Sequence, residues 1–113
     1  MEINAHRASL NGEPAVYCGT YGKYNNGDIS GMWVDVASFT DYEEFMEFCE
    51  RVHADEEDVE LMFQDYEGFP YAWYSESGMG EETFDKIKEF AKLTDNEREA
   101  YEGVWDSIKT FVE

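Results

Sequence analysis

The imbalance of charge constrains the fold of this chain more than any other sequence feature. Its 113 residues include 27 acidic and 8 basic side chains, which gives a formal net charge of −19 at pH 7. Repulsion between like charges opposes the compact state, so folding requires a substantial apolar core. Hydrophobic residues make up 42% of the chain and aromatic residues 17%, which argues against an acidic disordered protein. The length suits one compact domain, or a small domain with a helical extension.

The charge also excludes two classes of partner. A chain this acidic cannot bind nucleic acid or an anionic membrane through charge attraction, so we expect neither among its partners. Residues 1–10 lack the apolar run of a secretion signal. Cys18 and Cys49 lie among apolar neighbours, and we interpret both as reduced, partly buried thiols. These features predict a cytoplasmic protein, although adaptation to a salty cytoplasm would also explain the acidity.

The sequence pattern predicts an α+β fold with a small three-stranded antiparallel sheet. Residues 1–14 are expected to form a flexible lead-in to an α+β domain over residues 15–74. Strands are predicted over residues 16–21, 29–37 and 59–66, because these segments are β-branched and aromatic or alternate in polarity. Asn26 and Gly27 predict a tight hairpin turn between the first two strands. Gly31 indicates a bulge or a close backbone approach.

Helical periodicity marks three further segments. Tyr42, Phe45, Cys49 and Val52 recur at helical spacing, and Thr40 with Glu43 forms the predicted capping box. Residues 75–113 are expected to form a helical domain or a helical hairpin, in which helices over 81–93 and from Thr94 onward pack against each other or against the sheet. The last helix is predicted to be capped by Thr94 and Glu97, and its apolar stripe consists of Tyr101, Val104, Trp105, Ile108, Phe111 and Val112.

No enzyme motif is recognisable, and we predict no catalytic residue, cofactor or metal. The glycines near residue 19 fit neither a P-loop nor a dinucleotide fingerprint, and His6 and His53 lack the spacing of a zinc site. His53 is expected to be a solvated residue at a helix end. A small hydrolase that uses two converging carboxylates stays open as an alternative, because any pair of acids could meet in space.

Residues 55–60 raise the alternative of an acidic module that binds either calcium ions or a basic protein. This segment is rich in oxygen ligands, but it lacks the alternating spacing and the central glycine of an EF-hand loop. Weak binding of divalent cations is the most that its sequence supports.

The acidic residues concentrate between residues 41 and 67, where Arg51 is the one basic residue. On a helix, Glu43, Glu47 and Glu50 fall opposite the apolar stripe, together with Glu44. Carboxylates on successive turns lie roughly 5–6 Å apart at Cβ, which is comparable to phosphate spacing, so such a surface could compete for a basic DNA-binding groove. The predicted partner-binding surface consists of Asp41, Glu43, Glu44, Glu47, Glu50, Asp55, Glu56, Glu57, Asp58, Glu60, Asp65 and Glu67.

Two segments resemble the ArdA family of antirestriction proteins. Residues 16–35 contain a strand, the turn KYNNG at 23–27 and a strand that begins GMW at 31–33. Residues 65–70, DYEGFP, resemble the segment that follows the third strand in the family. The two segments occur in the family's order and are joined by a helix of the expected length.

The resemblance implies a non-enzymatic inhibitor, usually encoded on a mobile genetic element, that imitates B-form DNA. Such a protein occupies the DNA-binding groove of type I restriction-modification enzymes and blocks cleavage of foreign DNA. The family has an α+β amino-terminal domain, a helical middle domain and a further α+β domain with dimer contacts. This sequence resembles the first domain and part or all of the second, so whether it forms a homodimer is left open. Family function attaches to a distributed acidic surface, which implies no catalytic residue.

Overall fold

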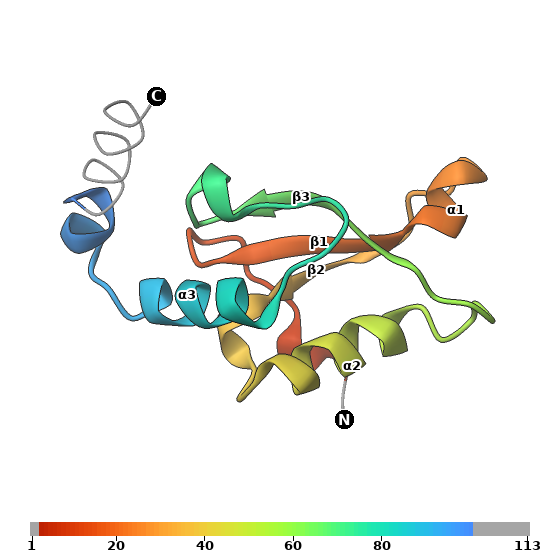
Figure 1. Cartoon of the computed structure of the whole chain (residues 1–113), viewed down its shortest axis with the longest axis horizontal. Helices are drawn as coiled ribbons and strands as arrows, with labels where there is room; N and C mark the ends of the chain where they lie inside the picture. Colours follow the sequence, from red (N-terminus) through yellow and green to blue (C-terminus); the bar gives the residue numbers. More distant parts are fainter. Residues whose placement is uncertain (1–2, 101–113) are drawn as a thin grey trace.

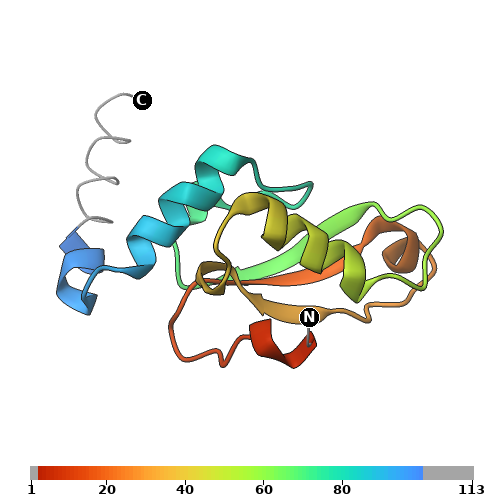
Figure 2. The same ribbon diagram turned by 90° about the horizontal axis from the view of Figure 1, so that it is seen from below.

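The computed structural model describes residues 3–100, which form a three-stranded antiparallel sheet with helices packed on one face (Figure 1). Figure 2 views the molecule from the helical side and shows α2 and α3 in front of the strands. The predicted α+β fold with this sheet is therefore confirmed. The main elements are β1 (Ala15–Thr20), β2 (Met32–Asp35), α2 (Tyr42–Val52), β3 (Leu61–Glu67) and α3 (Glu81–Ala91), and the short ones are η1 (Ile3–His6), α1 (Tyr21–Asn25), η2 (Val36–Ser38) and η3 (Tyr71–Trp73).

Strand β1 lies at the centre of the sheet, in the order β2-β1-β3. Its pairing with β3 contains a bulge, because Tyr17 pairs with Asp65 while Cys18 pairs with Phe63, and Gln64 has no partner in the ladder. The predicted alternation holds as far as Phe63, which belongs to the core. Beyond the bulge the period shifts, and Tyr66 packs against the core while Asp65 is exposed.

The connection between β1 and β2 differs from the predicted hairpin. Asn26 and Gly27 end the short helix α1 instead of forming a two-residue turn between strands. The Thr20 side chain caps the helix by accepting from the Lys23 N–H at 3.1 Å. At its other end, Asp28 N–H donates to Lys23 O at 2.8 Å and Gly27 N–H to Tyr24 O at 3.0 Å, which is a Schellman motif. Gly27 has φ +79°. The helix end therefore needs a left-handed residue at this position, as the predicted hairpin turn would.

The core is built around Phe45 of α2. Its ring lies 5.9 Å from that of Phe63 on β3, 5.4 Å from Phe39 and 5.5 Å from Phe84 on α3, measured between centroids. All four side chains are buried. One side chain therefore joins the sheet, the segment before α2, and α3. The predicted apolar stripe of α2 is present, with Phe48 as an additional buried member.

Helix α2 begins one residue later than predicted. Asp41, not Thr40, is the N-cap, and its side chain accepts from the Glu44 N–H at 2.9 Å. Glu44 Oε1 accepts in return from the Thr40 N–H at 3.1 Å. Asp41 and Glu44 thus make the reciprocal arrangement expected for Thr40 and Glu43, because aspartate is also a favoured N-cap.

Part of the lead-in is attached to the sheet. The His6 ring stacks on Phe39 with centroids 4.0 Å apart, and the Ala8 N–H donates to Trp33 O at 3.0 Å. Arg7 forms an isolated bridge with Val34. Residues 6–8 therefore extend the β2 edge, and the flexible lead-in expected over residues 1–14 stays a prediction.

The chain beyond α3 begins a second helix at residue 95. Its capping box is confirmed, because Thr94 Oγ1 accepts from the Glu97 N–H at 3.2 Å and Glu97 Oε1 from the Thr94 N–H at 2.8 Å. Arg98 fixes this junction by donating to Ala91 O at 2.8 Å and to Glu13 Oε2 at 3.0 Å. The apolar stripe from residue 101 lies outside the described residues, and the division at residue 75 stays a prediction. No helix within residues 3–100 is long and apolar enough to cross a membrane.

Gly68 provides a test of packing between the third strand and the lead-in. It has φ +80°, and an added Cβ would lie 2.5 Å from the Glu13 carbonyl carbon, whereas at Gly12, with φ +97°, an added Cβ meets nothing within 4 Å. We expect Gly12→Ala to lower the free energy of unfolding by about 1–2 kcal/mol through backbone strain. Gly68→Ala should lower it by about 2–5 kcal/mol, because about 1–3 kcal/mol of overpacking is added. Urea unfolding followed by tryptophan fluorescence measures both, and equal losses would contradict the close approach.

Candidate functional site

The outward face of α2 carries the most regular part of the acidic surface. Glu43, Glu47 and Glu50 are exposed and lie on successive turns. No ion pair within residues 3–100 involves any of these three carboxylates. Like charges at these spacings cost the helix a few tenths of a kcal/mol per pair. The helix tolerates that cost because its opposite face is buried in the core.

Asp41 and Glu44 differ from the other acids of this helix. Both belong to the capping arrangement at its N-terminus, and Glu44 is half-buried. Their negative charges also interact favourably with the positive end of the helix dipole. The structure therefore gives these two predicted surface residues a role in forming the helix, in addition to their charge.

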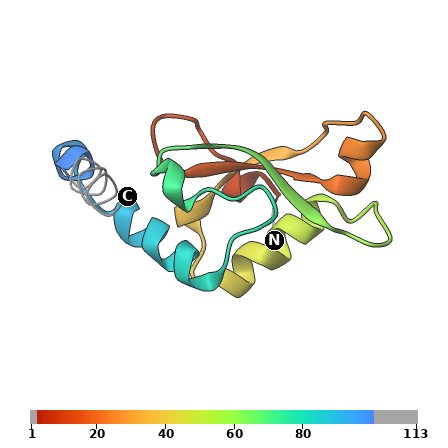
Figure 3. The ribbon, with the colours of Figure 1, turned by 45° about the horizontal axis from the view of Figure 1, so that its top comes forward.

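The acidic loop, residues 55–60, follows α2 and lies beside α1 at one end of the molecule (Figure 3). Asp55, Glu57, Asp58 and Glu60 are exposed, whereas Glu56 is half-buried and packs against Gly22 of α1. The Tyr21 N–H donates to Glu60 O at 3.0 Å. The loop thus continues the row of charges from α2 toward α1.

Lys23 and His53 hold the start of this loop in place. His53 is 1% exposed, so the prediction of a solvated residue at the helix end is wrong. Lys23 Nζ lies 2.9 Å from His53 Nδ1 and 2.9 Å from Asp55 Oδ1. Because the Cys18 carbonyl can only accept, His53 Nε2 donates to it at 2.9 Å. Both ring nitrogens are satisfied, which is why a histidine can be buried here.

Lys23 also changes the pKa of an acid in the acidic loop. Its hydrogen bond to Asp55 lowers the pKa of that carboxyl below the usual value. A single cation therefore neutralises one acid of the loop and leaves Glu57, Asp58 and Glu60 without an ion pair among the described residues.

Cys18 and Cys49 are free and fully buried. Contact with Cys49 holds the pKa of the Cys18 thiol below its usual range, burial opposes this effect, and His53 adds to it. A catalytic thiolate must meet its substrate, and both residues are 0% exposed. The pair therefore belongs to the core rather than to a nucleophilic site.

Asp65 and Glu67 lie on the other face of the sheet. They pair across the ladder with Tyr17 and Ala15, and paired residues share a face. Cys18, the neighbour of Tyr17, points toward α2, where its thiol donates to Cys49 O. The twelve predicted acids thus do not form one flat surface, because α2 and the acidic loop display most of them and the opposite face displays these two.

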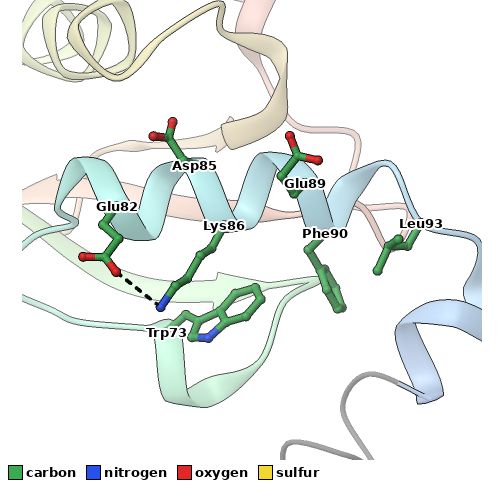
Figure 4. A pocket seen from close by; sticks show the side chains of 7 residues that line it. All are labelled: Trp73, Glu82, Asp85, Lys86, Glu89, Phe90 and Leu93. Atoms are coloured by element: carbon green, nitrogen blue, oxygen red, sulfur yellow. Dashed lines mark ion pairs between the residues drawn. The ribbon is translucent and has the colours of Figure 1, made fainter.

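A groove that sequence analysis did not predict lies between η3 and α3. Figure 4 shows the Trp73 indole beside α3, and its ring meets that of Phe90 edge-on with centroids 5.6 Å apart. The groove has a volume of about 490 Å³. Phe90 and Leu93 line its apolar part, and Glu82, Asp85, Lys86 and Glu89 line its polar part. Trp73 and Phe90 alone carried no functional signal in the sequence, because their approach depends on how η3 packs.

The described part of the chain contains no candidate set of metal ligands. Within residues 3–100, no three histidine, cysteine, aspartate or glutamate side chains converge in a way that could hold a metal ion. The exposed carboxylates of the acidic loop point into solvent instead.

Comparison with known proteins identifies one family. The sequence model of the family described as Antirestriction protein (ArdA) matches residues 16–113, which begins one residue into β1. No curated protein and no solved structure matches the chain.

The Lys23 contacts predict a measurable effect of Lys23→Met. Removing the ammonium leaves the buried His53 Nδ1 without its donor, so we expect the free energy of unfolding to fall by about 1–3 kcal/mol. The pKa of Asp55, measured by NMR titration, should rise toward the ordinary value of an aspartate. Because Lys23 lowers the folded pKa, its stabilising effect on Asp55 is present at neutral pH and disappears as pH falls through that pKa.

Lys86→Met is the matched control. Lys86 Nζ lies 3.9 Å from Glu82, and the two side chains are 51% and 89% exposed. Its loss should change stability by less than about 0.5 kcal/mol. Equal effects of the two substitutions would mean that Lys23 does not organise the loop.

Proposed function

The chain belongs to the ArdA family of antirestriction proteins, and we propose that it acts as a DNA mimic that blocks type I restriction-modification enzymes. In this proposal the protein occupies the basic groove in which the enzyme holds DNA, and foreign DNA escapes cleavage. It would act in the cytoplasm, where restriction enzymes meet incoming DNA, and its gene would suit a mobile genetic element. No catalytic residue is required.

The observation that carries the proposal is the uncompensated row of carboxylates on α2. Glu43, Glu47 and Glu50 are exposed on successive turns, which gives about 5–6 Å between neighbouring Cβ atoms. The row is continued by the acidic loop beside α1. A helix under no selection for charge would gain from interspersed lysines, and here Arg51 is the one basic residue of α2.

Electrostatic attraction would supply most of the binding. A groove that binds DNA through lysine and arginine attracts any polyanion of suitable shape. Salt screens such contacts with a Debye length of about 8 Å at physiological ionic strength, so inhibition should weaken as salt rises. Because each exposed charge contributes little, single acid-to-amide changes should have small effects.

The distribution of acids over both faces also supports the proposal. Asp65 and Glu67 lie on the sheet face that α2 does not cover, while Glu43 and Glu47 project from α2. A groove that encloses DNA contacts it from more than one side. A flat acidic surface would satisfy only one wall of such a groove.

A cleavage assay with purified type I restriction enzymes tests the function directly. The protein is titrated at low and at moderate salt, and excess unspecific DNA is added at a fixed degree of inhibition. We expect inhibition that falls with salt and with added DNA. A folded protein that inhibits none of several such enzymes would favour an acidic interaction module unrelated to restriction.

Simultaneous replacement of Glu43, Glu44, Glu47 and Glu50 by glutamine tests the placement of the surface. At about 0.5 kcal/mol for each of the three exposed charges, the loss is about 1.5 kcal/mol, or about tenfold in inhibitory potency. The Glu44→Gln change keeps a side-chain oxygen that can accept from the Thr40 N–H, so α2 should still form.

The control variant removes four charges from α3 instead, through amide replacement of Glu81, Glu82, Asp85 and Glu89. Both variants have the same net charge, so nonspecific attraction falls equally in each. We expect the α3 variant to retain clearly more inhibition than the α2 variant. Equal potency of the two would show that net charge, rather than the row on α2, determines binding.

A further inference from the structure

Residues 74–76 cover the edge of the sheet beyond β3. The Phe63 N–H donates to Glu76 O at 2.8 Å, and the Tyr74 hydroxyl donates to Phe63 O at 2.6 Å. Figure 3 shows this segment beside β3. The N–H and the C=O of Phe63 on the edge of β3 are thereby both paired.

Three tyrosines gather at this edge, in a cluster that we call the tyrosine patch (Tyr66, Tyr71 and Tyr74). The rings of Tyr66 and Tyr74 are stacked, with centroids 4.7 Å apart and planes at 23°. Tyr71 lies 6.1 Å from Tyr66 and 6.4 Å from Tyr74. Tyr66 and Tyr74 pack against the core, whereas Tyr71 is 71% exposed. The stacked rings of Tyr66 and Tyr74 are therefore held by the core, and the Tyr71 ring is exposed to solvent.

Glu76 borders the tyrosine patch, because Glu76 and Tyr74 both form hydrogen bonds with the backbone of Phe63. Burial raises the pKa of Tyr74, and the nearby charges of Glu76 and Asp65 raise it further. Glu76 Oε1 also accepts from the Tyr21 hydroxyl at 3.3 Å. Within residues 3–100 no ion pair involves Asp65, Glu67 or Glu76, so the aromatic rings lie in an uncompensated negative environment.

This combination suits one side chain above others. The arginine guanidinium is a planar cation that stacks on aromatic rings and forms forked hydrogen bonds with carboxylates. A lysine ammonium attracts carboxylates as a point charge, but it is more strongly hydrated and cannot stack. Tyrosines also lose little conformational entropy on binding and are enriched among residues that dominate interfaces.

We propose that the tyrosine patch binds arginine side chains of a basic protein partner, with Tyr71 as the stacking ring and Glu76 as a flanking carboxylate. The proposal rests on the proposed function, because it takes the partner to be the DNA-binding groove of a type I enzyme. It goes beyond imitation of phosphates, since stacking is short-ranged and less sensitive to salt than charge attraction. The contact would select arginine-rich grooves among basic ones.

The first test uses the purified type I enzyme and labelled DNA, with the protein as competitor. Tyr71→Ala should weaken competition about tenfold, as expected for an aromatic contact at an interface, and the loss should persist at higher salt. Tyr71→Phe keeps the ring and should retain most of the activity. Tyr24→Ala removes a tyrosine that is 51% exposed on α1 and should stay within about twofold of the parent.

One outcome separates this proposal from the function it rests on. If the parent competes and Tyr71→Ala competes equally well, the patch is not a contact, although the DNA-mimic proposal stands. Unchanged midpoints of thermal unfolding would show that Tyr71→Ala, at an exposed site, alters no folding.

The second test needs no restriction enzyme. Ten-residue arginine and lysine peptides of equal charge are titrated into the full chain, and binding is followed by NMR of the tyrosine rings. We expect the arginine peptide to bind about three- to fivefold more tightly, and Tyr71→Ala to abolish the difference. Equal binding of the two peptides, or a preference that survives Tyr71→Ala, would overturn the proposal even if the parent inhibits no enzyme.

Discussion

The aromatic contacts of Phe45 are the interaction on which the other features depend. They hold α2 against β3 and against α3 at the same time. The buried Phe45 side chain therefore fixes the position of the acidic face of α2. Full burial of one phenylalanine contributes about 1.5–3 kcal/mol, whereas each like-charged pair on the helix costs a few tenths. The core outweighs the repulsion by enough that the helix can carry acids without lysines between them. In the proposed function, the carboxylates are therefore available to a partner.

The sequence allowed the architecture to be predicted because its periodicities are clear. Alternation located the strands, and helical spacing located α2 and α3. The connection after β1 could not be predicted, because Asn26–Gly27 satisfies the same backbone requirement in a hairpin and at a helix end. The choice between them depends on the Thr20 hydroxyl and the carbonyl of Lys23. The bulge at Gln64 was hidden for a similar reason, since it depends on how two strands pair and not on either strand alone.

The candidate site was predictable to the extent that it lies on one helix. The exposure of Glu43, Glu47 and Glu50 follows from the buried stripe of α2. The position of Asp65 on the opposite face required knowledge of the ladder, and the burial of His53 required Lys23, which is 30 residues away in the chain. Charge counts gave no sign of Tyr71, whose surroundings arise from packing along β3. Residues whose roles depend on distant partners were those that sequence patterns missed.

Arg98 has a consequence for the geometry of the charges. Its guanidinium joins the last turn of α3 to the first turn of the next helix through Ala91 O, and it joins both to Glu13 in the loop before β1. The chain therefore leaves α3 in a defined direction, where a flexible joint would let it swing. Asp95, Glu97 and Glu99 keep fixed separations from the acids of α3 as a result. The proposed imitation of DNA would depend on the distances between charges, and at this junction one cation preserves the distances between many anions.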